Sequence, residues 1–327
     1  MKVCYDETQL ISYMRDASQV SPEHPILIDK YLENAIEIDV DGLCDGKECI
    51  IAGVMEHIEE AGVHSGDSAC TLPPFTLSGE MTELIKEATK AMALELNVIG
   101  LINVQFAVKD GLLYVIEVNP RASRTVPFVS KATGKQWAKL ATQVMLGKSI
   151  SELKLTDQKM KHWSVKEAVF PFRKFPGVDP LLSPEMKSTG EVMGIDADLG
   201  MAFFKAQQSA FNALPTKGCT VYAYERQTPL FKQIASEFQK IGCRVKFLDN
   251  QTEHEAAMVH FATLEKDKLI LSFMTKDHNE NESALRLSAL AYNIPFFTTE
   301  RAALSAIAAM NSSRAAPLEV KPLQEYY

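Results

Sequence analysis

The sequence has no run approaching the roughly 18 apolar residues that a membrane-spanning helix requires, and it has no C-x-x-C pair, internal repeat or low-complexity segment. It opens without the apolar stretch of a secretory signal. Its six cysteines are scattered, which predicts free thiols rather than a disulfide framework or a metal knuckle. Together these absences predict a soluble, cytoplasmic protein without a membrane partner.

The sequence also has fewer basic than acidic residues, with 34 Lys and Arg, 42 Asp and Glu and a formal net charge of −8. Phosphate backbones are bound by clustered Lys and Arg, so we expect no nucleic-acid partner. A hydrophobic content of 46% with 23% charged residues is typical of globular proteins. A chain of 327 residues is long enough for two or three domains.

Two patterns divide the chain. A short helix at 7–16, strands at 26–29, 35–40 and 48–57, a helix at 79–96 and a hairpin at 100–119 come first. Residues 153–217 read as irregular except for a helical stretch near 197–211. After residue 219 we predict short strands at 219–224, 243–248, 269–274 and 295–297 and helices at 282–292 and 299–310. A further helix is predicted to begin with Thr228 as N-cap and Pro229 in its first turn. That alternation predicts a small parallel α/β domain. We expect domain limits at 1–150, 151–214 and 215–327.

The hairpin separates two kinds of side chain by alternation. Its core face is predicted to hold Ile102, Val104, Phe106, Val108, Tyr114, Ile116 and Val118, and its polar face Asn103, Gln105, Glu117 and Asn119. A tight turn at Asp110-Gly111 by itself would pair Gln105 with Ile116. A three-residue loop or a bulge is therefore predicted, so that Gln105 lies opposite Glu117.

This polar face has the donors of a metal site. Gln105, Glu117 and Asn119 supply oxygen ligands of the kind that Mg²⁺ prefers. Arg121 and Arg124 follow directly, and guanidinium groups suit the charge on a phosphoryl group in transfer. Metal and arginines together indicate phosphoryl transfer, although a Glu and an Asn at a strand end more often belong to a solvated face.

Other candidate residues have ordinary interpretations as well. The loop at 61–68 is rich in small residues and by itself predicts only flexibility. Glu37 lies on an acidic strand face with Asp39 and Asp41, and such a carboxylate usually sits on the surface of an edge strand. His64 is a lone histidine in a polar loop, for which a hydrogen bond is commoner than a metal.

Several segments taken together resemble the large chain of carbamoyl-phosphate synthase. They read DVD at 39–41, MEHIE at 55–59, GVHSGDS at 62–68, NVQFA at 103–107, EVNPRASRTVPFVSKATG at 117–134, FPGVDP at 175–180 and STGEVMG at 188–194. The resemblance covers about residues 1–194 and is to the second of the family's two ATP-grasp units. It implies an α/β fold class, with an α+β ATP-grasp subdomain followed by a small parallel domain similar to methylglyoxal synthase.

The resemblance also implies an activity, which is the phosphorylation of carbamate by ATP to give carbamoyl phosphate for arginine and pyrimidine synthesis. ATP with Mg²⁺ or Mn²⁺ would be the cofactors, and Arg121 and Arg124 the catalytic residues. Gln105 and Glu117 would bind both nucleotide and metal, and Asn119 the metal. The remaining nucleotide-binding residues would be Lys30, Leu32, Glu37, Gly62, Val63, His64 and Ser65.

The sequence departs from the family pattern at its start. No Gly-rich phosphate-covering loop precedes Asp29, and the family's first ATP-grasp unit is absent as well. We therefore expect a partner chain to supply the missing half-site and the N-terminal unit, and a glutamine amidotransferase small chain to supply ammonia. The isolated chain is expected to bind ATP weakly and to be inactive.

Two other functions remain open, namely a non-catalytic binding or assembly chain and a different ATP-grasp carboxylate–amine ligase. For the C-terminal domain we predict no nucleotide-effector site. Asp249 would repel an effector phosphate, and Phe273 and Met274 would obstruct it. Thr275, Lys276 and Thr298-Thr299 remain as the plausible phosphate contacts.

Overall fold

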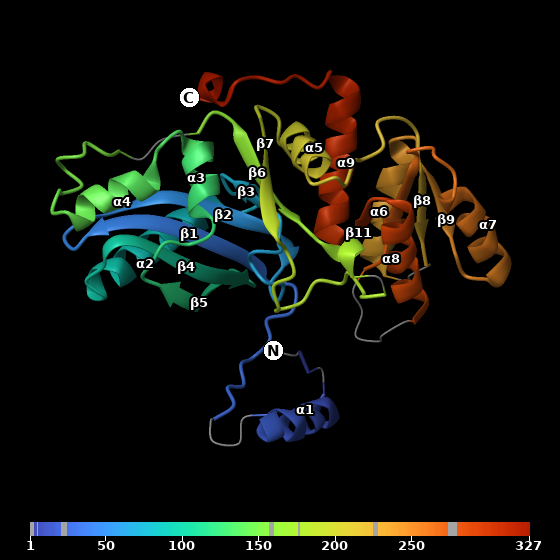
Figure 1. Cartoon of the computed structure of the whole chain (residues 1–327), viewed down its shortest axis with the longest axis horizontal. Helices are drawn as coiled ribbons and strands as arrows, with labels where there is room; N and C mark the ends of the chain where they lie inside the picture. The colour runs from blue at the N-terminus through green and yellow to red at the C-terminus, as the bar shows by residue number, and fades with distance from the viewer. Residues whose placement is uncertain are drawn as a thin grey trace.

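The computed structural model describes residues 3–4, 6–20, 25–156, 160–175, 177–224, 228–273 and 280–327. Within them the chain forms an antiparallel sheet of order β5-β4-β1-β2-β3-β6-β7 and a parallel sheet of order β11-β10-β8-β9 (Figure 1). The antiparallel strands are β1 (Ile36–Asp45), β2 (Cys49–Glu60), β3 (Cys70–Leu72), β4 (Ile99–Lys109), β5 (Leu112–Asn119), β6 (Trp163–Val169) and β7 (Gly190–Asp196). The parallel strands are β8 (Thr220–Ala223), β9 (Arg244–Phe247), β10 (Lys268–Leu271) and β11 (Phe296–Phe297). The predicted fold class is confirmed, whereas the domain limits stay a prediction.

Helices cover both faces of the antiparallel sheet. α2 (Gly79–Glu95) begins at Ser78, whose hydroxyl accepts the third backbone N–H of the helix, and packs on the face that carries Ile102 and Val104. α3 (Val126–Thr133) and α4 (Trp137–Met145) pack on one end of the opposite face. The other end of that face is left to polar side chains, and the candidate site lies there.

The parallel sheet is enclosed in apolar layers. α6 (Pro229–Lys240) and α9 (Glu300–Ala315) pack on one face, and α7 (Gln251–Phe261) and α8 (Glu280–Tyr292) pack on the other. α6 begins as predicted, with Thr228 as N-cap and Pro229 in the first turn. α7 was not predicted.

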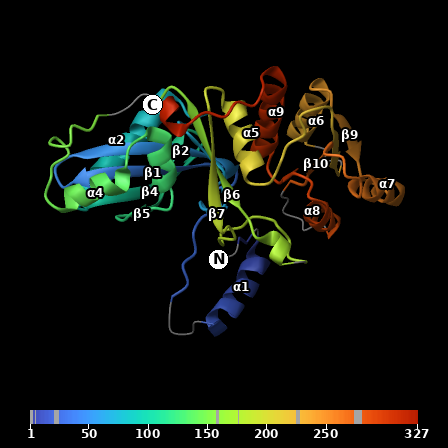
Figure 2. The same cartoon turned by 45° about the horizontal axis from the view of Figure 1, so that its top comes forward.

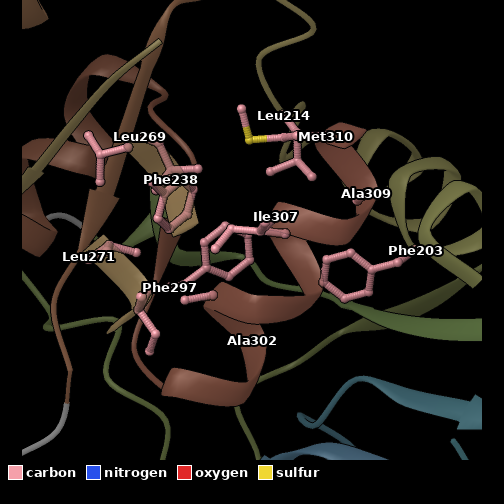
Figure 3. Packing of buried hydrophobic residues seen from close by; sticks show 14 of the residues in the cluster. Phe203, Leu214, Phe238, Leu269, Leu271, Phe297, Ala302, Ile307, Ala309 and Met310 are labelled. Carbon is pink, nitrogen blue, oxygen red and sulfur yellow. The ribbon is translucent and has the colours of Figure 1, made fainter. Parts of the chain in front are cut away.

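A shared helical layer joins the two sheets. α5 (Leu199–Ser209) lies between β7 and α9, and Figure 3 shows Phe203 of α5 pointing toward Ile307 of α9. The contact is close because two positions have no side chain: a Cβ on Gly194 would lie 1.9 Å from the carbonyl oxygen of Ala202, and one on Gly200 would lie 2.7 Å from that of Ala308. One hydrophobic cluster therefore includes residues of both sheets, among them Val165 of β6 and Leu269 of β10.

The prediction of an irregular segment at 153–217 was wrong for β6 and β7, which complete the antiparallel sheet. β6 does not alternate simply, because Lys166 and Glu167 are both buried in its middle. Charged residues in a short strand look like loop residues unless their buried partners are known. η1 (Phe172–Lys174) follows β6 as a short 3-10 turn.

The two ends of the described chain differ in their packing. α1 (Glu7–Val20) lies away from both sheets (Figures 1 and 2), and residues 26–29 join neither sheet, so the predicted strand there was wrong. At the C-terminus, η2 (Leu323–Tyr326) returns to the antiparallel part, where the Tyr326 hydroxyl donates to the Ile195 carbonyl at 3.3 Å. Among the described residues no helix is both long and apolar enough to cross a membrane.

Candidate functional site

The β4–β5 hairpin brings the predicted metal ligands together. Asp110 and Gly111 form the turn with φ values of 52° and 75°, the left-handed conformation that two-residue hairpin loops require. The register then shifts by one residue at Ile116, and Gln105 pairs directly with Glu117. The predicted bulge is therefore confirmed, and the two side chains lie on the same face of the sheet.

The bulge also corrects the predicted core face. Tyr114 and Ile116 were expected to be buried, but their side chains are 37% and 49% exposed. Beyond an extra residue the alternation is reversed, and Leu113 packs against the core beneath β4 instead. The polar set is unaffected because Glu117 and Asn119 lie on the other side of the bulge.

A chain of hydrogen bonds continues from Glu117. Asn119 donates its amide N–H to the Glu117 carboxylate at 2.8 Å, and its amide oxygen accepts from Arg121 at 3.2 Å. Glu117 and Arg121 are exposed, whereas Asn119 is half-buried. A carboxylate, two amide oxygens and a guanidinium thus meet at the open edge of the sheet.

The loop at 61–68 lies against Gln105. The Gln105 amide donates to the Ser65 hydroxyl at 2.8 Å, and the buried Lys166 ammonium donates to the Ser65 carbonyl at 2.9 Å. Gly62 has a φ of 108°, and a Cβ there would lie 2.6 Å from the ring of Tyr31. Hydrogen bonds thus hold the loop in place at Ser65, and the ring of Tyr31 covers it at Gly62.

The structure places the other predicted nucleotide residues around this loop. Leu32 packs against Ala61 in a small apolar cluster, and Lys30 beside it is exposed. Val63 is buried, and the Nδ1 of His64 accepts the Gly66 N–H at 3.0 Å. The ordinary interpretation of His64 as a hydrogen-bonded side chain agrees with this contact.

Glu37 is buried, so its interpretation as a surface carboxylate on an edge strand was wrong. β1 is an inner strand with β4 and β2 on its two sides, and the Glu37 side chain is 6% exposed. Burial raises the pKa of Glu37 to about 7, although His57 and the Gly62 N–H oppose the shift; the nearby charges of Asp39 and Glu117 add to it. The predicted nucleotide-binding residue Glu37 and the predicted metal ligand Glu117 therefore interact electrostatically.

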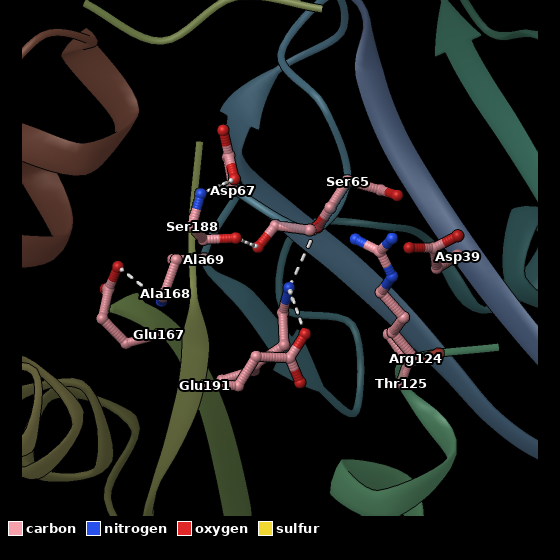
Figure 4. Close-up of polar contacts among 12 residues, drawn as sticks. Asp39, Ser65, Asp67, Ala69, Arg124, Thr125, Glu167, Ala168, Ser188 and Glu191 are labelled. Atoms are coloured by element: carbon pink, nitrogen blue, oxygen red, sulfur yellow. Dashed lines mark hydrogen bonds and ion pairs between the residues drawn. The ribbon is translucent and has the colours of Figure 1, made fainter. Parts of the chain in front are cut away.

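Buried charges lie behind the site. The Nε2 of His57 is 3.1 Å from an Asp39 carboxylate oxygen. The buried Lys166 Nζ is 4.0 Å from the partly exposed carboxylate of Glu191, which is labelled in Figure 4. Burial alone would lower the pKa of His57, but the hydrogen bond to Asp39 and the charge of Glu37 raise it. The same bond lowers the pKa of Asp39 against the effect of burial. These pairs make the charged forms tolerable in the interior.

Asp41 fixes the segment that carries the second arginine. Its carboxylate accepts from the Ser123 hydroxyl at 2.7 Å and from the Thr125 hydroxyl at 2.6 Å. Burial raises the pKa of Asp41 to about 6, although these hydrogen bonds oppose the shift. Arg124 lies between the two anchors, and its guanidinium contacts the sulfur of Met186. The backbone that carries Arg124 is thus held in place by hydrogen bonds on both sides of the arginine.

Sequence reasoning missed the residues that support the site, namely Asp41, His57 and Lys166. The alternation of Glu37, Asp39 and Asp41 had marked an acidic strand face. What the pattern could not show is that Asn103 donates to Asp41 from the neighbouring strand, at 3.0 Å. The available signal was a carboxylate at every second residue of a strand that is otherwise apolar.

A second group of carboxyls lies between the two sheets. A cavity of about 330 Å³ is lined by Glu59 and Glu167 together with residues of α5, α8 and β11. Burial raises the pKa of Glu167 to about 8, and the nearby charge of Glu59 adds to the shift. The Glu59 carboxylate accepts the Ala69 N–H at 2.6 Å. Both effects favour the protonated form of the Glu167 carboxyl.

The predicted obstruction of an effector site in the loops of the parallel sheet is only partly correct. Phe273 is buried and packs edge-on against Phe231, with ring centroids 5.7 Å apart, so it does not block the loop as expected. It turns inward because the α6 side of the sheet end offers an apolar contact. Residues 274–276 lie outside the described residues. The Thr299 hydroxyl caps α9.

Comparison with known proteins gives consistent similarities. The family model described as "Carbamoyl-phosphate synthase L chain, ATP binding domain" matches residues 1–153. The carbamoyl phosphate synthase large chain of Archaeoglobus fulgidus is 46% identical over 100% of this chain and 32% of its own length. The C-terminal section of the large chain from Aquifex aeolicus is 42% identical over 100% of this chain and 68% of its own.

The chain thus spans about a third of the length of the full-length relatives. Among solved structures, the biotin carboxylase domain of a thermophilic 2-oxoglutarate carboxylase matches with a TM-score of 0.47 and 17% identity. That match covers 64% of this chain and 54% of the other.

Proposed function

Because the chain belongs to the family of carbamoyl-phosphate synthase large chains, we propose that it takes part in the ATP-dependent phosphorylation of carbamate. A carbamate oxygen would attack the γ-phosphorus of ATP, and ADP would leave as carbamoyl phosphate forms. One observation supports this proposal above the others: the bulge at Ile116 sets Glu117 opposite Gln105, next to Asn119 and Arg121.

The donor set fits a hard divalent cation. Gln105, Glu117 and Asn119 offer oxygen atoms and one full negative charge, with exposure at Glu117 that leaves room for water and phosphate. Mg²⁺ or Mn²⁺ held there would neutralise charge on the nucleotide phosphates.

The arginines would act on the transferring group. Arg121 is joined to the ligand Asn119, and Arg124 is fixed between the two anchors on Asp41. Guanidinium groups held in place need no reorganisation when charge moves onto the phosphoryl oxygens. Their role is to stabilise that charge.

The nucleotide would lie along the loop at 61–68. Backbone and side chains of Gly62, Val63, His64 and Ser65 would line it, and Lys30, Leu32 and Glu37 would hold adenine and ribose. The contact between Tyr31 and Gly62 supports this placement because it joins the two segments. At neutral pH Glu37 would be partly protonated and could donate as well as accept a hydrogen bond.

The proposal includes a larger assembly. Since the full-length relatives are about three times as long, a chain or segment supplying the remaining ATP-grasp half and the N-terminal unit would complete the site. A glutamine amidotransferase small chain would provide ammonia, and the product would serve arginine and pyrimidine synthesis. Alone, this chain would not turn over ATP, because Glu117 and Arg121 are exposed and water would reach phosphates bound beside them.

The test is reconstitution. The chain would be co-purified with its partner from the source, and ATP formation from carbamoyl phosphate and ADP, the reverse of the proposed step, would be measured. We expect activity in the complex and none in the chain alone. In the complex, Glu117→Ala should reduce the rate by about 100-fold, whereas Glu87→Ala, on the exposed side of α2, should not change it.

The result also separates the alternatives. A stable complex that neither forms ATP nor hydrolyses it in the presence of carbamate would support the non-catalytic assembly function. Carbamate-dependent ATPase in the isolated chain, abolished by Glu117→Ala, would show that the chain needs no partner. Activity that survives Glu117→Ala would overturn the metal assignment.

A further inference from the structure

Two cysteines meet at the start of the parallel sheet. Cys219 directly precedes β8, Cys243 directly precedes β9, and the pairing of Thr220 with Arg244 sets the two cysteines in register. Their sulfur atoms are 2.7 Å apart, and both side chains are buried. Neighbouring strands lie about 5 Å apart, which is within the Cα separation that a disulfide spans.

An arginine is fixed beside them. Arg314, in the last turn of α9, donates to the carbonyl oxygens of Thr216 at 3.3 Å, Lys217 at 2.7 Å and Ile241. One of its nitrogens is 4.0 Å from the sulfur of Cys243. These contacts close both chain segments around the thiols and keep a positive charge next to one of them.

The two thiols are unequal for this reason. The hydrogen bond from Cys219, together with the charge of Arg314, lowers the pKa of Cys243 even though burial opposes it. The same hydrogen bond, with burial, raises the pKa of Cys219. The deprotonated form is therefore favoured at Cys243 rather than at Cys219, and the two sulfur atoms are in contact, which is the arrangement of an attacking and a resolving cysteine.

The chain contains a matched pair that lacks this arrangement. Cys44 and Cys49 lie opposite each other on β1 and β2. Burial raises the pKa of Cys44 and raises that of Cys49 to about 12. The two cysteines are adjacent in both pairs, but only in the pair of Cys219 and Cys243 is the pKa of one thiol lowered, at Cys243 beside Arg314.

We propose that Cys219 and Cys243 form an oxidation site for small hydroperoxides. The Cys243 sulfur attacks the peroxide oxygen, the O–O bond breaks, and a sulfenic acid forms as hydroxide or alkoxide leaves and takes up a proton. The Cys219 sulfur then attacks the sulfenic sulfur, and the S–S bond forms as water leaves. Two thiols are oxidised, and one peroxide is reduced to water, or to water and an alcohol.

The experiment treats the intact protein with a small excess of hydrogen peroxide, blocks the remaining thiols with N-ethylmaleimide and maps the peptides by mass spectrometry. We expect the Cys219–Cys243 disulfide to form at least about 10-fold faster than any product at Cys44 or Cys49. Dithiothreitol should restore both thiols. Equal rates at the two pairs, or no disulfide between Cys219 and Cys243, would overturn the proposal.

Two variants refine the test. Cys219→Ser should stop the reaction at a sulfenic acid on Cys243, which dimedone traps, and Arg314→Gln should slow the first step. A trapped sulfenic acid on Cys219 in Cys243→Ser at the same rate would contradict the assigned order. Peptide mapping of the unmodified protein decides the question if a variant does not fold.

Discussion

The two sheets differ in the kind of side chain that they bury. The antiparallel sheet buries Glu37, Asp39 and Asp41 on one face of a single inner strand. The parallel sheet is covered on both faces by apolar side chains of four helices. Burying a charge costs free energy unless the charge is paired. The buried carboxylates therefore reduce the stability of the antiparallel sheet where the candidate site lies, whereas apolar packing stabilises the parallel sheet.

The difference shows where function and stability are divided. The charged face ends at the open edge that carries Glu117 and Arg121, and its buried groups hold the loop at 61–68 and the arginine segment. The apolar layers reach the antiparallel sheet through α5 and α9. Each of the following predictions changes one side of this comparison.

The largest effect is expected where the two sheets join. Gly194→Ala should lower the free energy of unfolding by about 4 kcal/mol, because its Cβ would overlap backbone atoms of α5 that cannot move aside. Gly190→Ala on the same strand is the control, since its nearest neighbour would be 3.8 Å away. Urea denaturation measures both, and a similar loss in the two variants would contradict the shared layer.

The buried charges come next. Lys166→Met should cost about 3 kcal/mol, because it removes the buried ammonium that interacts with Glu191 and Asp39 and that donates to the Ser65 carbonyl. Lys86→Met, which breaks a largely exposed pair with Glu83, should change stability by less than about 0.5 kcal/mol. Equal losses would show that the buried network adds nothing beyond a surface pair.

A smaller effect concerns pH. Because folding raises the pKa of Glu167 from 4.5 to about 8, its protonated form favours the folded state. That contribution is complete below about pH 4.5 and is lost as the pH rises to about 8. Glu167→Gln should therefore flatten the fall in stability between these values, measured by urea denaturation at a series of pH values. Glu95→Gln, on an exposed part of α2, should leave the wild-type slope in place.

For the last prediction, the addition of a nucleotide, we expect no effect on thermal stability. Titration with uridine and inosine monophosphates should not shift the melting temperature, since Asp249 at the end of β9 would repel a phosphate. The inward turn of Phe273 removes one argument for this prediction and leaves the acidic residue as the other. Micromolar binding that Lys276→Ala abolishes would show that an effector site is present after all.

Much of this architecture could be predicted from local patterns. The alternation of the parallel module, the Thr228-Pro229 helix start and the polar and apolar sets of the hairpin all depend on neighbours in sequence. The bulge was predictable because a tight turn and a shared polar face are geometrically incompatible without it. β6 was missed because its buried Lys166 and Glu167 interact with partners that are far away in the chain.

The amino-acid sequence by itself determined the two kinds of sheet, the order of the candidate ligands from Gln105 to Arg124, and the family to which the chain belongs. Only the tertiary structure decided that Glu37 is buried, that Lys166 holds Ser65, and that Cys219 touches Cys243. The physical reason is that local conformation follows from near neighbours, whereas burial and pKa depend on which distant segments pack together.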